Sequence, residues 1–229
     1  MARGGSQHIP RPAQWSTAGP AVWHGRDLAA LADFDALTDA LMHRVADREP
    51  GDWAPPYLPA DDRRASAVLV ALHDSPSGPS VVLTRRTSTL STHRGEMAFP
   101  GGRLEEGETV VDAAVREAHE EVGLDPSLVT PWGMLDTLST MVSSSRIHPV
   151  VATLPGTPEL VAHDREVERI VHVPLVELAS DDTYRRETWV RSGHTVDMHF
   201  FEIEGDTVWG ATGRMLHQLL DLLTAPRTA

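Results

Sequence analysis

The sequence contains no cysteine among its 229 residues. A disulfide framework, a thiolate nucleophile and a thiolate zinc site are therefore excluded. The sequence also has no run of about 18 apolar residues, the length that a membrane-spanning helix needs. Residues 1–15 lack the apolar core of a secretory signal. We therefore expect a cytoplasmic protein without a membrane partner.

Several common catalytic signatures are missing as well. The sequence contains no His-Glu-x-x-His, no Walker A motif and no Gly-x-Ser-x-Gly, which removes support for a zinc peptidase, a P-loop NTPase or a serine hydrolase. Basic residues are few: 20 Lys and Arg stand against 33 Asp and Glu, for a formal net charge of −13. Such a chain repels nucleic acids and anionic membranes. A phosphorylated substrate must therefore be met by a metal ion and by local arginines.

The acidic residues gather in one stretch, residues 101–124, whose sequence is GGRLEEGETVVDAAVREAHEEVGL. Apolar residues recur there at spacings of four, three and four, which predicts an amphipathic helix over 109–122. At about 100° per residue, three glutamates fall together on a different face of that helix. The apolar stripe is Val111, Val115, Ala118 and Val122, and the acidic patch is Glu117, Glu120 and Glu121.

The acidic patch has two interpretations. A solvated charged face is the ordinary one. However, Glu117 and Glu121 are like charges four residues apart, a spacing that destabilises a helix unless a cation lies nearby. Carboxylate oxygens are the ligands that hard divalent ions prefer. We therefore expect Glu117, Glu120 and Glu121 to bind Mg²⁺ or Mn²⁺.

The same stretch resembles the Nudix box, whose pattern is Gly-x5-Glu-x7-Arg-Glu-U-x-Glu-Glu-x-Gly-U with U aliphatic. The box spans residues 102–124 and every fixed position is matched, by Gly102, Glu108, Arg116, Glu117, Ala118, Glu120, Glu121, Gly123 and Leu124. The resemblance implies an α+β fold, the Nudix-type α/β/α sandwich with a mixed central sheet. It also implies a metal-dependent hydrolase that cleaves a pyrophosphate linkage in a nucleoside diphosphate derivative. A catalytically silent module that senses a nucleotide is the alternative from another class.

The resemblance also implies roles for individual residues. Arg116 would orient the carboxylates, and one box glutamate or Glu166 would act as the base. Gly101 and Gly102 let the backbone approach a ligand closely. The catalytic set is then Arg116, Glu117, Glu120, Glu121 and Glu166.

Residues 82–102 resemble the signature of the coenzyme A pyrophosphatase branch of the Nudix superfamily. Leu83, Thr84, Arg86, Gly95 and Phe99 to Gly102 stand where the signature places them, whereas Ser91 stands where it has an arginine. This likeness implies that coenzyme A or an acyl derivative is cleaved to 3′,5′-ADP and 4′-phosphopantetheine. ADP-ribose, NADH and other nucleotides are the alternatives.

Three arginines bracket the polar segment before the box, namely Arg85, Arg86 and Arg94. Guanidinium groups offer forked donors that suit phosphate. We expect these arginines, with Gly101 and Gly102, to bind the substrate, and Arg86 to hold a phosphate far from the scissile bond. His93, His148 and His199 receive no catalytic role.

Elsewhere the pattern predicts one domain over 27–229, preceded by a flexible arm over 1–26 that is rich in Gly and Pro. Helical spacing predicts a helix over 28–48 and a closing helix over 215–223. Short apolar runs predict strands at 65–73, 80–84, 129–138, 147–154 and 166–173, and a hairpin across residues 192 and 193. A homodimer is left open, and a small nucleotide is the expected partner.

Overall fold

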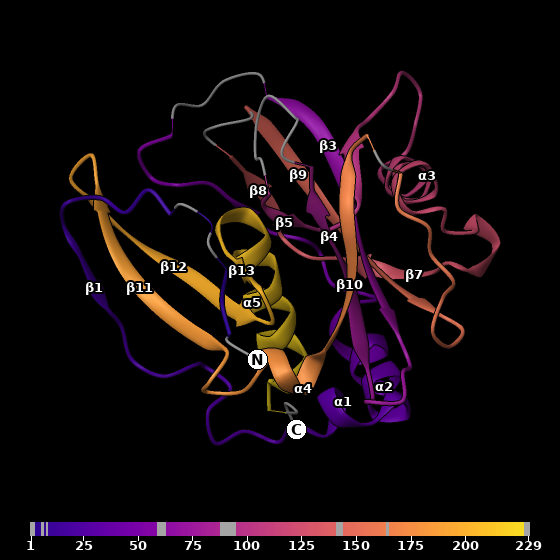
Figure 1. Ribbon diagram of the computed structural model, residues 1–229, viewed down its shortest axis with the longest axis horizontal. Helices are drawn as coiled ribbons and strands as arrows, with labels where there is room; N and C mark the ends of the chain where they lie inside the picture. The colour runs from indigo at the N-terminus through magenta and orange to yellow at the C-terminus, as the bar shows by residue number, and fades with distance from the viewer. Residues whose placement is uncertain are drawn as a thin grey trace.

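The computed structural model describes residues 3–5, 7, 9–58, 63–87, 95–140, 144–163 and 165–226. Helix α3 (Val110–Val122) covers one face of a large mixed sheet, and helix α5 (Gly210–Thr224) lies on the other side of that sheet (Figure 1). A smaller antiparallel sheet packs beyond α5. This arrangement confirms the α+β sandwich with a mixed central sheet.

The large sheet is mixed because its two central strands run parallel while their outer neighbours run antiparallel. Strand β3 (Arg64–His73) pairs in parallel with β9 (Ser145–Leu154). Strand β4 (Ser80–Arg86) pairs antiparallel with β10 (Val167–Pro174). The order along the sheet is β10-β4-β3-β9-β8-β2, with β5, β6 and β7 attached to β4, β3 and β9. The remaining bounds are β2 (Asp52–Trp53), β5 (Met97–Ala98), β6 (Gly101–Arg103), β7 (Thr130–Met134) and β8 (Thr137–Ser139).

Strand β3 is apolar along its length because both of its faces are buried. Successive side chains of a strand point to opposite faces. Ala67, Leu69 and Ala71 enter the core under α3, whereas Val70 and Leu72 enter the core on the α5 side. The sheet therefore separates two hydrophobic cores.

Helix α3 has well-defined ends. The Thr109 side chain accepts a hydrogen bond from the backbone N–H of Asp112 and caps the N-terminus. Gly123 ends the helix at a φ of 66°, a left-handed conformation that glycine adopts without steric cost. A short 3-10 helix (Pro126–Leu128) follows and leads into β7.

The predicted helix over 28–48 is two helices in the structure, α1 (Ala29–Ala32) and α2 (Phe34–Arg44). Asp33 interrupts them because its backbone is extended and its side chain accepts from the Ala36 N–H, which makes it the N-cap of α2. The predicted strand over 129–138 is likewise two strands, β7 and β8. A further short helix, α4 (Leu175–Leu178), follows β10.

The smaller sheet has the order β1-β11-β12-β13. Strand β1 (Trp15–Thr17) belongs to the N-terminal arm and pairs with β11 (Tyr184–Arg191). The predicted hairpin joins β11 to β12 (His194–Ile203), and β13 (Asp206–Val208) completes the sheet. The division into an arm over 1–26 and a domain from 27 stays a prediction. Parts of the arm are nevertheless attached to this sheet, since Gly4 and Gln14 form backbone hydrogen bonds with it and β1 pairs with β11.

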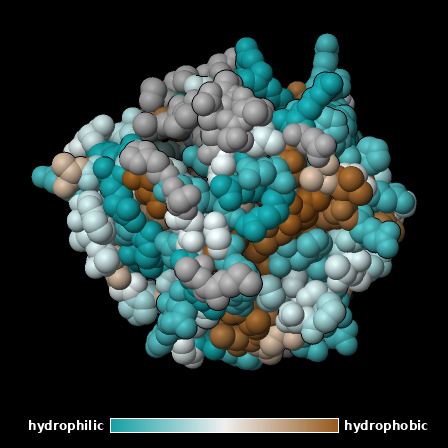
Figure 2. Space-filling view, in the orientation of Figure 1, coloured by the Kyte–Doolittle hydropathy of each residue, from teal (hydrophilic) through white to brown (hydrophobic). Residues whose placement is uncertain are grey.

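The face of the molecule in Figure 2 is mostly hydrophilic, with apolar side chains exposed in patches. Within the described ranges, no helix is long and apolar enough to cross a membrane.

Candidate active site

Glu121 lies on the buried side of α3, although the helical spacing places it on a different face from the apolar stripe. Only 4% of Glu121 is exposed. The apolar side of the helix is also shifted, since Ala113 and Ala114 are in the core while Val115 is only half-buried. Small alanine side chains let α3 approach the sheet closely, which brings Glu121 against the strands.

Two groups of the sheet meet the Glu121 carboxylate. The backbone N–H of Gly101 donates to Oε2 at 3.1 Å. Nη1 of Arg86, the last residue of β4, lies 3.5 Å from Oε1. Burial nevertheless raises the pKa of Glu121 to about 7, and the charges of Glu117 and Glu166 act in the same direction. The Gly101 N–H and Arg86 therefore do not fully offset the cost of burying the negative charge of Glu121.

Because Gly101 and Gly102 have no side chains, β6 can lie close to β3 and to Glu117 of α3. A Cβ atom at Gly102 would lie 2.4 Å from Cδ and Oε1 of Glu117. A Cβ atom at Gly101 would lie 2.3 Å from the carbonyl oxygen of Ala67. No other residue fits at these two positions without moving its neighbours, and at Gly102 the neighbour is a predicted metal ligand.

Arg116 is the centre of an ion-pair network. Its Nε and Nη2 donate to the two carboxylate oxygens of Glu108 at 2.7 and 3.0 Å. Its Nη1 lies 3.0 Å from Oε1 of Glu117 and 3.3 Å from Oε2 of Glu120. The hydrogen bond from Arg116 lowers the pKa of Glu108 to about 2. Arg116 therefore fixes three box glutamates at once.

Glu108 was not among the predicted site residues. It is a fixed position of the box pattern, so the signal was available, but the pattern does not say which cation it meets. The structure assigns that cation as Arg116.

The donor set is of the kind that a hard divalent ion prefers. Burial raises the pKa of Glu117, and the charges of Glu120 and Glu166 raise it further against the opposing effect of Arg116. Glu117 and Glu121 thus share an environment of mutual repulsion that a divalent cation relieves. Among the described residues no three acidic or histidine side chains already form a cage for a metal ion. Glu120 in particular is directed to Arg116, and 57% of its side chain is exposed.

The structure brings Glu166 to this site from another element. Glu166 lies one residue before β10, and its carbonyl oxygen accepts a hydrogen bond from the N–H of Thr87, just after β4. Its charge acts on both Glu117 and Glu121. Glu166 therefore lies just before β10, and Arg86 lies at the end of the neighbouring strand β4.

Two of the three predicted substrate arginines, Arg85 and Arg86, lie on opposite faces of the large sheet. Arg85 and Arg86 are consecutive in β4, so their side chains point to opposite faces of the sheet. Arg86 meets Glu121 on the α3 side, whereas Nη1 of Arg85 lies 3.2 Å from the buried carboxylate of Asp206. Arg94 lies outside the described residues.

Comparison with known proteins agrees with this geometry. A family model described as NUDIX domain matches residues 63–192. The "Uncharacterized Nudix hydrolase NudL" of Photorhabdus laumondii is 34% identical over 166 residues, covering 72% of this chain and 88% of that protein. Nudix hydrolase 3 of Caenorhabditis elegans is 32% identical over 180 residues, covering 72% of this chain and 75% of its own.

Among solved structures, the Nudix hydrolase RenU of M. smegmatis is 25% identical with a TM-score of 0.45, covering 56% of this chain and 75% of that chain. The family match covers the acidic helix and the strands around it. The chain therefore belongs to the Nudix hydrolases, enzymes that act on pyrophosphate bonds.

Proposed function

We propose that this enzyme hydrolyses the pyrophosphate linkage of coenzyme A or an acyl-coenzyme A, giving 3′,5′-ADP and 4′-phosphopantetheine, with Mg²⁺ or Mn²⁺ as cofactor. The observation that carries the proposal is the contact of Arg86 with Glu121 at 3.5 Å. It joins a residue of the 82–102 signature to a buried carboxylate of the box. Substrate recognition and hydrolysis thereby share one place in the fold.

Glu117, Glu120 and Glu121 would hold the divalent ion. When bound, such an ion neutralises charge on the phosphoryl oxygens and lowers the pKa of a bound water. Arg116 keeps Glu117 in place through the contact described above, and it also contacts Glu120. For Glu120 to join the other two, its carboxylate has to turn away from Arg116.

The protein's own residues handle the substrate and the proton. Arg86 donates to an oxygen of the pyrophosphate beside Glu121, where its charge offsets that of the phosphate. The attacking water forms a bond to one phosphorus while the bridging P–O bond breaks. Glu166 is our candidate for the carboxylate that accepts the proton of that water, since it lies near both box glutamates.

The preference for coenzyme A rests on residues 82–102, in which Arg86, Gly95 and Phe99 to Gly102 match the branch signature. ADP-ribose and NADH are the alternative substrates, because Ser91 departs from that signature. A cytoplasmic location and a homodimer likewise stay predictions.

A substrate panel tests the proposal. Purified enzyme is incubated with Mg²⁺ and with coenzyme A, ADP-ribose, NADH or oxidised dGTP, and the products are identified by mass. We expect the highest kcat/KM for coenzyme A or its acyl derivative, with 3′,5′-ADP among the products. A clear preference for ADP-ribose or a nucleoside triphosphate would overturn the coenzyme A assignment while leaving the Nudix hydrolase assignment intact.

A further inference from the structure

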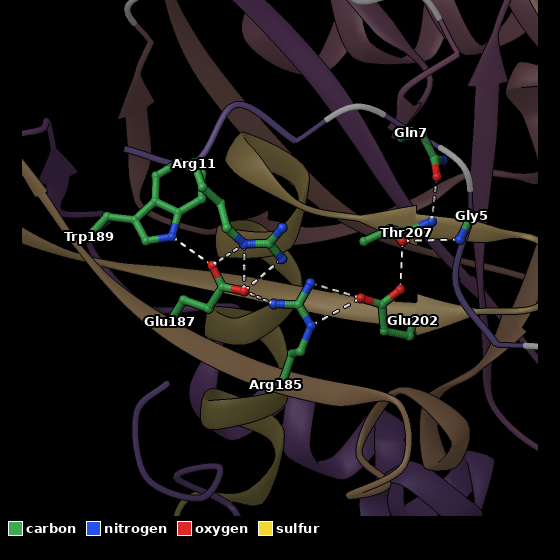
Figure 3. Close-up of polar contacts among 8 residues, drawn as sticks. All are labelled: Gly5, Gln7, Arg11, Arg185, Glu187, Trp189, Glu202 and Thr207. Carbon is green, nitrogen blue, oxygen red and sulfur yellow. Dashed lines mark hydrogen bonds and ion pairs between the residues drawn. The ribbon is translucent and has the colours of Figure 1, made fainter. Parts of the chain in front are cut away.

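The N-terminal arm is attached to the smaller sheet by buried polar groups. Glu187 is 1% exposed, and its carboxylate accepts from Nε and Nη2 of Arg11 at 2.9 and 2.8 Å. The indole N–H of Trp189 donates to the same carboxylate at 2.7 Å, and Arg185 also pairs with it (Figure 3). Burial alone would raise the pKa of Glu187, but these donors hold it below its ordinary value. A charged, fully paired carboxylate thus anchors the arm at Arg11.

Nearer the N-terminus, the arm follows β13. The N–H of Gly5 donates to Oγ1 of Thr207 at 3.1 Å, and the N–H of Thr207 donates to Oε1 of Gln7 at 3.1 Å (Figure 3). Oγ1 of Thr207 donates in turn to Glu202 at 2.6 Å. The side-chain oxygen of Gln7 is therefore held by β13, and its amide nitrogen can donate to other groups.

The amide nitrogen of Gln7 lies within hydrogen-bonding distance of two acceptors, one of them next to the end of β4. Nε2 of Gln7 lies 2.9 Å from Oδ1 of Asp206 and 3.4 Å from the carbonyl oxygen of Gly95. Asp206 is fully buried and also pairs with Arg169 and with Arg85. Strands β4, β10 and β13 and the arm therefore meet at this one carboxylate.

Gly95 connects Gln7 to the site through the end of β4. The N–H of Gly95 donates to the carbonyl oxygen of Arg86 at 3.1 Å, and the N–H of Arg86 donates to Glu96 at 3.0 Å. The side chain of Arg86 then lies 3.5 Å from Glu121. A displacement of Gly95 or of the end of β4 moves the residue that we assign to the substrate phosphate.

We infer that Gln7 is a positioning residue, through which the N-terminal arm holds Gly95 and the end of β4 so that Arg86 faces the acidic helix. This inference rests on the proposed role of Arg86. Gln7 and Asp206 both lie outside residues 63–192, the range of the family match. The arm thus adds to the substrate-binding apparatus a support that the Nudix motifs do not contain.

The test compares Gln7→Ala with Gln14→Ala in the full chain. Gln14 belongs to the same arm, is exposed and takes part in the sheet through its backbone carbonyl, so its side chain is the matched control. Asp206 is a poorer probe, because its removal leaves two arginines without their buried partner. Gln7→Glu serves as the second variant, since it keeps the size of the side chain but loses the donor and repels Asp206.

Two measurements are made on each variant. Losing a hydrogen bond with a net value of about 1 kcal/mol should raise the amide exchange rates of Arg86 and Gly95 in the metal-free protein by about three- to tenfold. The kcat/KM for coenzyme A should fall by a similar factor of about three to ten, because a displaced Arg86 no longer faces the pyrophosphate as well. Gln7→Glu should match or exceed these effects, and Gln14→Ala should show neither.

Each other outcome overturns the inference. Exchange in both Gln7 variants equal to that of Gln14→Ala would show that the contact holds nothing in place. Exchange raised evenly over α3 and both sheets would show a purely structural role, and faster local exchange with unchanged kcat/KM would show that Arg86 does not depend on it. If wild type does not cleave coenzyme A, the proposed substrate fails separately, and the kcat/KM comparison is made with the substrate that the panel selects.

Discussion

Nη1 of Arg86 lies 3.5 Å from Oε1 of Glu121, so the last residue of β4 contacts the most buried glutamate of the acidic helix. The signature residues predicted a substrate-binding role for Arg86, with a phosphate far from the scissile bond as its partner. The contact with Glu121 places the guanidinium beside the predicted metal ligands instead. We therefore assign Arg86 to the pyrophosphate itself.

Arg86→Ala should consequently lower kcat/KM for coenzyme A and for dephospho-coenzyme A by the same factor, about tenfold or more. Both substrates contain the pyrophosphate, and only coenzyme A has the 3′-phosphate. Steady-state kinetics with the two substrates makes the comparison, with Arg64→Ala as a control because Arg64 is exposed at the start of β3. An effect confined to coenzyme A would show instead that Arg86 binds the 3′-phosphate, which is far from the scissile bond.

Gly102→Ala should reduce turnover by about tenfold or more with little change in melting temperature. The added Cβ would lie 2.4 Å from Glu117, and the carboxylate has to move to make room. Gly19→Ala is the control, since a Cβ atom there meets Arg186 only at an ordinary distance of 3.8 Å. Full activity in Gly102→Ala would show that the position of Glu117 does not matter.

Binding of Mn²⁺ should weaken by about tenfold or more in Glu117→Gln and Glu121→Gln, because each loses a charged oxygen ligand. Burial raises the pKa of Glu121 to about 7, so a proton competes with the metal below that pH. The affinity of wild type should therefore rise as the pH rises through about 7. Titration followed by paramagnetic resonance measures both effects, and Glu106→Gln, at an exposed box position, should behave as wild type.

Acid should destabilise the fold through two stacked histidines, the buried His199 and the half-buried His217. His199 and His217 stack at 3.8 Å beside Tyr184, and burial lowers their pKa values to about 2 and about 4. In the unfolded chain both titrate near pH 6.5, so it gains protons that the folded state does not bind. The stability is therefore present above pH 6.5 and is lost as the pH falls toward about 4.

Urea unfolding between pH 8 and pH 5 tests this dependence. The free energy of unfolding should fall by about 1 kcal/mol or more per pH unit below 6.5. His217→Phe keeps the ring packing and should reduce the slope, whereas His24→Phe, at an exposed position, should keep it. An equal slope in wild type and His217→Phe would exclude the pair as its source.

The sequence was most informative where one local rule decides the structure. Thr109 and Gly123 mark the ends of α3 because a cap and a left-handed turn depend only on neighbouring residues. Apolar runs similarly located β3, β4 and β9. Apolar spacing alone missed the helix boundary at Asp33. The spacing continues across this residue, but Asp33 caps α2 and so divides the predicted helix in two.

Contacts between distant segments could not be predicted in the same way. The periodicity of α3 separated Glu121 from the apolar stripe, whereas in the structure Glu121 is buried against Gly101 and Arg86 because alanines bring the helix close to the sheet. Likewise, Arg85 and Arg86 look equivalent in the sequence until the strand directs one to Asp206 and the other to Glu121. Strands β1, β2, β5 and β6 are too short to show a period of two.

The central claim is that the carboxylates of α3 serve the hydrolysis of coenzyme A, and its most direct test is the turnover of coenzyme A by Glu121→Gln beside Glu106→Gln at saturating Mg²⁺. Burial disfavours the charged form of Glu121, so a neutral glutamine should leave the fold intact. We predict that wild type and Glu106→Gln release 3′,5′-ADP and 4′-phosphopantetheine. The kcat of Glu121→Gln should fall about a hundredfold or more, which corresponds to about 2.7 kcal/mol of lost transition-state stabilisation. Near-normal turnover by folded Glu121→Gln would contradict the account.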